Sequence, residues 1–215
     1  MAILLPDEPG LAAAYADEKP VRDAYWHPAR GDVVIDLGAA VGSYAVPALM
    51  AGARVIAVDP DRQATDRLER VAAFNGLGGL DWLTVVHAAV WDEPGYPPDM
   101  RAALEAGGYA YLIPRPGDPW TTLDDLAAGL SRLDWIKIDV EGAELGVLRS
   151  GRKTLAEFRP RMLIEDHTEV YPYVAAMDSR GQCYELLENL GYRVTEVPWG
   201  PPPRTYLICD PWGQP

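Results

Sequence analysis

Ionisable side chains gather in two short segments of the chain. Residues 137–144 read Lys-Ile-Asp-Val-Glu-Gly-Ala-Glu, and residues 165–167 read Glu-Asp-His. Carboxylates beside an imidazole are the groups that bind a divalent cation, or that form a general base with its orienting acid. The two segments therefore predict a metal site or an acid–base site, with solvated charges at strand ends as the alternative.

A second feature is the small-residue segment 36–43, which reads Asp-Leu-Gly-Ala-Ala-Val-Gly-Ser after an apolar run. Small residues let a ligand approach the backbone, and a following helix presents free amides. A dinucleotide site needs G-x-G-x-x-G, but Ala40 stands where the middle glycine belongs and Asp36 precedes the turn. The segment suits a ligand that is cationic at this end and has no phosphates, unless it only links a strand to a helix.

Two further strand ends carry groups that suit a nucleoside. Asp59 and Pro60 follow the next apolar run, and a carboxylate there can accept both ribose hydroxyls. Ala88 and Ala89 follow His87 and leave room for a flat base, whereas His87 itself is expected to be a packed strand residue. An exposed carboxylate before a proline turn is the alternative for Asp59.

The elements that must position these residues alternate between strands and helices. Runs nearly continuous in Val, Ile and Leu alternate with segments that have apolar residues at helical spacing, which predicts βαβ units and a doubly wound α/β sheet. Ligands of such sheets bind beyond the carboxyl ends of the strands. The predicted strands are 33–37, 54–59, 83–87, 135–139, 161–165, 192–197 and 205–209, and the predicted helices are 43–51, 63–74, 123–131 and 144–158.

Three other segments complete the predicted organisation. The last two strands have no helix between them and should pair as an antiparallel hairpin. Residues 7–29 should form an amphipathic cover on the sheet or over its carboxyl edge. Residues 92–120, rich in Gly and Pro, should form an irregular excursion around a short helix at 100–106. Its aromatic side chains would wall an acceptor pocket or pack within the loop: Tyr96, Tyr109, Tyr111 and Trp120.

Composition narrows the class of protein. The 215 residues carry 19 basic and 32 acidic side chains, for a net charge of -13, so the average field repels nucleic acid and anionic lipid. No run approaches the roughly 18 apolar residues of a membrane span, and the first residues do not resemble a secretory signal. We expect a cytoplasmic protein. Cys183 and Cys209 lack C-x-x-C spacing and are expected to be buried free thiols.

The chain resembles S-adenosylmethionine-dependent methyltransferases of the FkbM type. The most specific match is Thr-Leu-Asp at 122–124 followed by Ile-Lys-Ile-Asp-Val-Glu-Gly at 136–142. The resemblance implies a Rossmann-like, seven-stranded methyltransferase sheet within a domain of residues 31–215, preceded by an N-terminal helical cover of residues 1–30. The other matching segments are 31–44, 55–60, 74–77, 88–92 and 160–165.

The resemblance also implies a set of cofactor-binding residues for S-adenosylmethionine. The first strand and its turn would hold the methionine end, Asp59 the ribose, and Ala88 with Ala89 the adenine. The chain departs from the family at Ala40, where glycine or asparagine is commoner, and at Asp59, where the family usually has glutamate. The full set is Asp36, Gly38, Ala39, Ala40, Gly42, Ser43, Asp59, Pro60, Ala88, Ala89 and Asp139.

For the chemistry, the resemblance implies in-line transfer of a methyl group to a hydroxyl of a small molecule, such as a natural product or a saccharide. By resemblance, Asp139, Glu165 and Asp166 would bind Mg²⁺ or another divalent cation, which lowers the pKa of the hydroxyl. The metal-free alternative uses His167 as the base, its pKa raised by the surrounding carboxylates. Lys137 would neutralise the developing oxyanion or form a salt bridge with Asp139.

Two functions of other classes stay open at this point. One is a nicotinamide-dependent oxidoreductase on the same fold, and the other is a nucleoside-binding module without catalysis. The expected partner is a small-molecule hydroxyl acceptor, with neither nucleic acid nor membrane, and a homodimer is left open.

Overall fold

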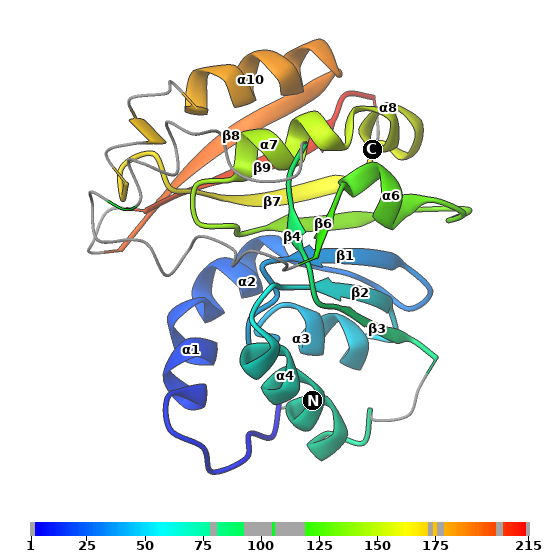
Figure 1. The fold of residues 1–215 in the computed structure, drawn as a ribbon, viewed down its shortest axis with the longest axis vertical. Helices are drawn as coiled ribbons and strands as arrows, with labels where there is room; N and C mark the ends of the chain where they lie inside the picture. The colour runs from blue at the N-terminus through cyan, green and yellow to red at the C-terminus, as the bar shows by residue number, and fades with distance from the viewer. Residues whose placement is uncertain are drawn as a thin grey trace. The chain divides into compact units, whose positions relative to one another are not determined.

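The computed structural model describes residues 3–77, 81–92, 105, 119–171, 174–175, 179–200 and 204–213 (Figure 1). Seven strands form one sheet in the order β3-β2-β1-β6-β7-β9-β8, and β4 pairs with β5 in a second, small sheet. The predicted α/β fold with a seven-stranded sheet is confirmed. The chain forms two compact units, Met1–His87 with Arg132–Lys137, and Ala88–Ser131 with Ile138–Pro215.

The first unit is built on parallel strands. In it β1 (Val33–Leu37) pairs with β2 (Arg54–Val58), which pairs with β3 (Leu83–Val86). Every residue of β1 is buried, as expected for an apolar strand that is covered on both faces. The helices α3 (Ala45–Met50) and α4 (Arg62–Phe74) follow β1 and β2 along the chain. These elements lie where the sequence predicts them.

Two N-terminal helices, α1 (Leu11–Asp17) and α2 (Lys19–Tyr25), belong to the same unit. Leu11 and Tyr15 of α1 and Val21 of α2 are buried. Trp26, which ends α2, packs edge-on against Tyr44, with 5.6 Å between the ring centroids. The segment before β1 therefore contains two short helices.

The second unit ends in antiparallel strands. There β7 (Arg161–Asp166) pairs with β9 (Arg204–Pro211), which pairs in turn with β8 (Tyr192–Trp199). Trp199 faces Arg204 in the register of the last pair, so the predicted C-terminal hairpin is confirmed. The remaining strand of the large sheet, β6 (Trp135–Ile138), has its last residue in this unit.

The predicted helix 144–158 is two helices, α7 (Glu144–Ser150) and α8 (Arg152–Phe158). A Cβ atom at Gly151, between them, would collide with the side chain of Leu123. Leu123 begins α6 (Leu123–Ala127), whose first turn is capped because the Thr122 hydroxyl accepts from the amide of Asp125 at 3.0 Å. Close packing of α6 thus decides a break that helical spacing does not reveal.

Among the helices and strands of the described residues, three were not predicted from the sequence. The helix α10 (Ser179–Asn189) lies beside α7 and β8 (Figure 1), and β4 (Ala89–Val90) pairs with β5 (Trp120–Thr121). The apolar face of α10 is short, since its buried residues include only Cys183, Leu186 and Leu187 as larger apolar or thiol side chains. Of the predicted short helix 100–106, only residue 105 is described, and it is helical. Tyr96, Tyr109 and Tyr111 lie outside the described residues.

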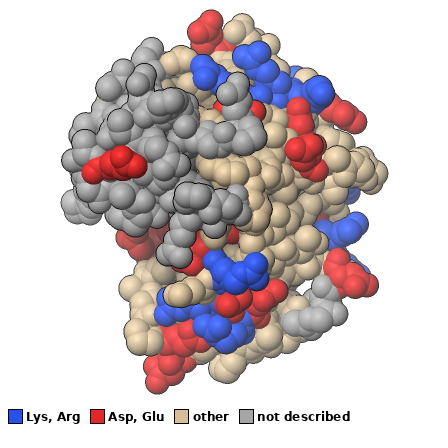
Figure 2. All heavy atoms as spheres, viewed as in Figure 1, with Lys and Arg blue, Asp and Glu red and all other residues tan. Residues whose placement is uncertain are grey.

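Surface charges of opposite sign lie close together where α1 and α4 are seen, in the lower part of Figure 2. Glu8 pairs with Arg70 at 3.0 Å and with Arg67 at 3.2 Å. These hydrogen bonds lower the pKa of the Glu8 carboxyl. The pairs tie the N-terminal segment to α4. Within the described part of the chain, no helix has the length and apolar composition to cross a bilayer.

The thiols of Cys183 and Cys209 are free and buried, as predicted, and burial raises the pKa of both. Since the thiolate is the reactive form, we expect both cysteines to react with Ellman's reagent at least about 100-fold more slowly in the native protein than in guanidinium chloride. A Cys183→Ala variant assigns each thiol. Rapid labelling of either cysteine in the native protein would contradict its burial.

Candidate functional site

The turn after β1 has a left-handed backbone at three positions, with φ of 75° at Gly38, 44° at Ala40 and 87° at Gly42. A residue with a side chain is strained in this region, by about 1–3 kcal/mol. The Asp59 carboxylate holds Ala40 there, because its Oδ2 accepts from the Ala40 amide at 2.9 Å and its Oδ1 from the Asp61 amide at 2.8 Å. Glycine and asparagine tolerate this backbone best, so an alanine at this position needs support from its surroundings.

The amides of the turn already donate to protein acceptors. Gly38 and Ala39 both donate to the Val58 carbonyl, at 2.9 and 3.1 Å, and Gly42 donates to the Ala39 carbonyl at 2.8 Å. A dinucleotide site instead directs such amides at phosphate oxygens. The turn therefore does not favour the nicotinamide-dependent alternative.

Most of the predicted cofactor residues lie together in the first unit, at the ends of β1 and β2. Asp36 and Asp59 are buried there. Burial raises the pKa of the Tyr15 phenol in α1. The positive charge of Arg22 lowers this pKa, and the negative charge of Asp36, which acts on the same phenol, raises it. The residues brought together are Asp36, Gly38, Ala39, Ala40, Gly42, Ser43, Asp59 and Pro60.

The other predicted cofactor residues, Ala88, Ala89 and Asp139, belong to the second unit. Ala88 and Ala89 are buried, and the Ala89 amide donates to the Pro119 carbonyl at 2.9 Å. Trp120, predicted to wall a pocket or to pack in the loop, lies in β5 and is partly buried. In the first unit, His87 packs as expected, with its Nδ1 3.0 Å from the Thr65 hydroxyl.

The N-terminal helices contact the turn directly. Arg22 donates to the Ser43 carbonyl at 2.9 Å, and Tyr15 donates to the Val41 carbonyl at 3.1 Å. The Ser43 hydroxyl donates to Glu18 at 2.7 Å. The cover thus lies at the carboxyl end of β1, one of the two predicted places. The sequence carried no signal for Arg22 or Glu18, because a polar residue on a short helix is ordinarily solvated.

Lys137, a predicted catalytic residue, is fully buried in the first unit. Its Nζ atom lies 4.9 Å from the centroid of the Tyr44 ring, a cation–π contact with the residue that follows the turn. Its role at a developing oxyanion stays a prediction.

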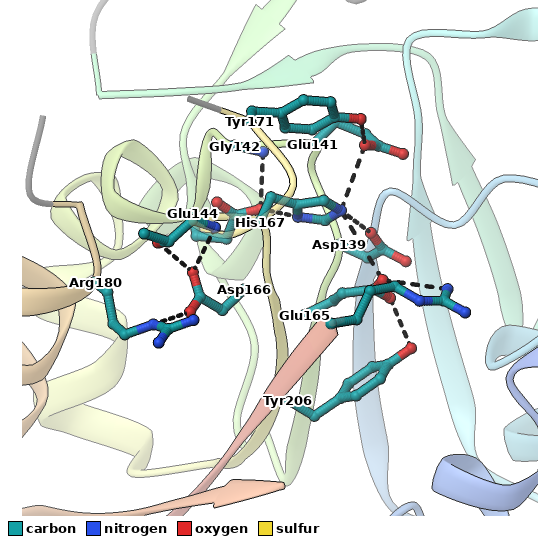
Figure 3. A network of polar contacts seen from close by, with 12 residues as sticks. Asp139, Glu141, Gly142, Glu144, Glu165, Asp166, His167, Tyr171, Arg180 and Tyr206 are labelled. Carbon is teal, nitrogen blue, oxygen red and sulfur yellow. Dashed lines mark hydrogen bonds and ion pairs between the residues drawn. The ribbon is translucent and has the colours of Figure 1, made fainter. Parts of the chain in front are cut away.

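In the second unit, a cluster of carboxylates surrounds His167 (Figure 3). The Nδ1 atom lies 2.8 Å from Oε1 of Glu144, the first residue of α7. The Nε2 atom lies 3.3 Å from Glu141 Oε2, 3.7 Å from Asp139 Oδ1 and 4.0 Å from Glu165 Oε1. The ring itself is buried. Both imidazole nitrogens therefore face negative charge.

These surroundings set the charge of His167. Burial opposes protonation, but Glu144, through its charge and its hydrogen bond, and the charges of Asp139 and Glu141 outweigh it and raise the pKa to about 10. The ring is consequently an imidazolium at neutral pH and cannot accept a proton in that state. The predicted role of His167 as a general base requires that it first lose this proton.

The structure does not bring the three predicted metal ligands together. The Asp166 carboxylate accepts from Arg180, which belongs to α10, and from the hydroxyl of Thr168. Glu165 accepts from the Tyr206 hydroxyl at 2.7 Å, on the side of β7 that carries the His167 ring (Figure 3). Successive side chains of a strand point to opposite faces, which separates Glu165 from Asp166.

A different set of side chains has the geometry of a cation site. Among the described residues, Asp139, Glu141 and His167 each offer a ligand atom, and these atoms lie within 4.8 Å of one another. Glu141 has a left-handed backbone, with φ of 54°. The hydroxyl of Tyr171 donates to Glu141, and its ring stacks on His167 with 5.6 Å between centroids. Glu141 belonged to the charged segment found in the sequence, whereas nothing marked Tyr171.

We expect a Glu144→Gln substitution to lower the pKa of His167 substantially, because it removes the carboxylate that contributes most to raising it. A folded pKa above the unfolded value of about 6.5 means that the charged ring stabilises the fold below that pH and that this contribution is lost as the pH rises toward 10. NMR titration of His167 with EDTA present measures the shift. Glu157→Gln, exposed on α8, is the control; equal pKa values in both variants would contradict the assignment.

Comparison with known proteins identifies the family of this chain. Residues 36–194 match the Methyltransferase FkbM domain. A methyltransferase FkbM structure from Methylobacillus flagellatus is similar, with a TM-score of 0.63 and 19% identity over 87% of this chain and 46% of that chain. This chain thus spans less than half of that protein. A search of curated proteins found no significant match.

Two other solved structures have the same fold at low identity. Precorrin-6y C5,15-methyltransferase from Geobacter metallireducens has a TM-score of 0.53 and 15% identity, over 98% of this chain and 92% of that chain. Ribosomal protein L11 methylase from Lactobacillus delbrueckii subsp. bulgaricus has a TM-score of 0.51 and 14% identity, over 96% of this chain and 81% of that chain. The names of these two proteins refer to different substrates, so the likenesses concern the fold alone.

Proposed function

The chain belongs to the FkbM methyltransferase family, and we propose that it transfers the methyl group of S-adenosylmethionine to a hydroxyl oxygen of a small molecule, such as a natural product or a saccharide. The observation that carries this proposal is the turn after β1. The amides of residues 38–40 and 42 are bonded within the protein, and the carboxylates of Asp36 and Asp59 lie at the ends of β1 and β2 beside it. Such a turn suits a cofactor with a cationic sulfonium and a ribose but no phosphate.

The residues of the first unit fit this cofactor. The buried carboxylate of Asp36 provides negative charge for the methionine end. A carboxylate has about four acceptor sites, more than the bonds from Ala40 and Asp61 use at Asp59, so ribose hydroxyls can also donate to it. In the predicted arrangement Ala88 and Ala89 adjoin the adenine. When bound, S-adenosylmethionine supplies a methyl group that needs little activation.

The remaining task of the protein is to align the acceptor oxygen and to take its proton. We assign the proton to Asp139, because its side chain is 20% exposed and is therefore accessible from solvent. The imidazolium of His167, 3.7 Å away, offsets the negative charges of Asp139, Glu141 and Glu144. Lys137 remains the proposed partner of a developing oxyanion.

A divalent cation also fits the cluster, held by Asp139, Glu141 and His167 in place of the Nε2 proton. A metal-binding histidine characteristically donates its other ring nitrogen to a carboxylate, as Nδ1 does to Glu144 at 2.8 Å. One imidazole with two carboxylates suits Mn²⁺ or Zn²⁺, and also admits Mg²⁺. When bound, the cation would lower the pKa of the acceptor hydroxyl.

Cofactor binding tests the proposal without knowledge of the acceptor. We expect the purified protein to bind S-adenosylhomocysteine but not NAD in isothermal titration calorimetry. Asp59→Ala should raise the Kd for S-adenosylhomocysteine at least about 10-fold, because it removes the ribose acceptor and releases Ala40. Asp66→Ala, an exposed carboxylate on α4, is the matched control. Binding of NAD in place of S-adenosylhomocysteine would refute the proposal.

Turnover tests the assignment of the cluster. Across a panel of hydroxyl compounds, we expect S-adenosylhomocysteine to form and Asp139→Asn to lower kcat by about 10²–10⁴-fold, the usual contribution of a positioned base. Chelation with EDTA, followed by Mn²⁺ or Mg²⁺, shows whether a cation takes part. Asp166→Asn separates the two ligand sets, because only the set predicted from sequence makes Asp166 necessary. Absence of turnover in the parent, despite cofactor binding, would favour the nucleoside-binding module.

A further inference from the structure

The N-terminal helices hold the outer side of the turn that follows β1. Arg22 of α2 is 6% exposed, and two hydrogen bonds of its guanidinium are buried. One guanidinium nitrogen donates to the Ser43 carbonyl at 2.9 Å, and the other to the Tyr15 carbonyl at 3.3 Å. The guanidinium also lies 5.9 Å from the centroid of the Tyr15 ring. One side chain thus joins α1, α2 and the turn.

Three further hydrogen bonds also join the N-terminal segment to residues 41–44. Tyr15 donates its hydroxyl proton to the Val41 carbonyl at 3.1 Å, and Glu18 accepts from the Ser43 hydroxyl at 2.7 Å. Trp26 donates from its indole nitrogen to the Tyr44 carbonyl at 3.2 Å. The carbonyls of residues 41, 43 and 44 therefore accept from the helices, while the amides of residues 38–40 donate to Val58 and Asp59.

A turn with three left-handed residues needs such support. Its backbone is stable only if its surroundings determine it, since other conformations of Ala40 are lower in energy when it is isolated. Val58 and Asp59 fix the first half of the turn, before Val41. The second half, residues 41–44, is fixed by the helices. Of the helix donors, Arg22 is the charged one, and charge-assisted hydrogen bonds are the stronger kind.

We propose that Arg22 is a positioning residue for the cofactor, and that the N-terminal helices are a working part of the cofactor site. By holding Ser43 and Tyr15, Arg22 keeps residues 41–43 in the conformation that receives the methionine end of S-adenosylmethionine. This inference rests on the proposed function, because it concerns how the same turn binds that cofactor.

Calorimetric titration with S-adenosylhomocysteine tests the inference. Arg22→Met keeps the length of the side chain and removes its donors, so we expect Kd to rise at least about 10-fold; Arg22→Lys, which can still reach one carbonyl, should recover part of the affinity. Arg67→Met is the matched control, because Arg67 also donates to a carbonyl of the N-terminal segment, that of Pro9 at 2.7 Å, but does not contact the turn. Its Kd should equal that of the parent.

Thermal melting separates positioning from a purely structural role. Titrations are run at a temperature where each variant is fully folded by circular dichroism. If Arg22 only stabilises the fold, Arg22→Met lowers Tm but leaves Kd unchanged, which would overturn the inference. If Arg22→Met does not fold, Tyr15→Phe takes its place, because it removes only the bond to the Val41 carbonyl; a Kd unchanged in that variant also overturns the inference.

The two proposals fail in different ways. A parent protein that does not bind S-adenosylhomocysteine contradicts the proposed function itself. A parent that binds it, with Arg22→Met and Tyr15→Phe binding equally well, leaves that function standing and removes only the role of the helices.

Discussion

The hydrogen bond from the Ala40 amide to Asp59 joins the two features on which the first unit depends. It ties the end of β2 to the turn after β1 and holds Ala40 in a left-handed conformation, with φ of 44°. The same carboxylate caps the turn that leads into α4 by accepting from Asp61. One buried side chain therefore links the conformation of the turn after β1 to the way in which the chain enters α4. A methyl group at residue 40 is tolerated because this bond offsets the strain.

The second unit is organised by charge balance around a single imidazole. Four carboxylates lie within 4.0 Å of the His167 ring nitrogens. Negative charges that gather around one ring repel one another, and the repulsion is stronger where water is excluded. The protonated ring balances part of this charge, and Arg204 pairs with Glu165 at 3.5 Å. Tyr171 adds a stacked ring and a hydrogen bond to Glu141, which orients one of these carboxylates.

Family membership and site geometry answer different questions about this protein. The FkbM domain match covers residues 36–194 and establishes a methyltransferase family. Solved structures of the same fold carry names as different as a precorrin methyltransferase and a ribosomal protein methylase, so the fold does not select the acceptor. This chain itself adds the carboxylates around His167 and a net charge of -13, which disfavours binding of nucleic acid.

The sequence by itself determined which segments form the seven strands of the large sheet, the C-terminal hairpin, and the two segments in which ionisable side chains gather. Apolar runs such as residues 33–37 are local patterns, and they predict buried strands without knowledge of the partner strand. The turn after β1 was found in the same way, because its small residues follow one another in the sequence.

Only the tertiary structure decided which side chains meet. Glu144 and His167 are 23 residues apart, and Arg22 and Ser43 are 21 apart, so neither contact leaves a local pattern. Adjacent residues, in contrast, were separated: Glu165 faces His167 while Asp166 faces Arg180, since side chains alternate along a strand. The helix break at Gly151 likewise depends on Leu123, which packs there from another helix. Sequence encodes which groups are present and on which elements, whereas distance between those groups is set by how the elements pack.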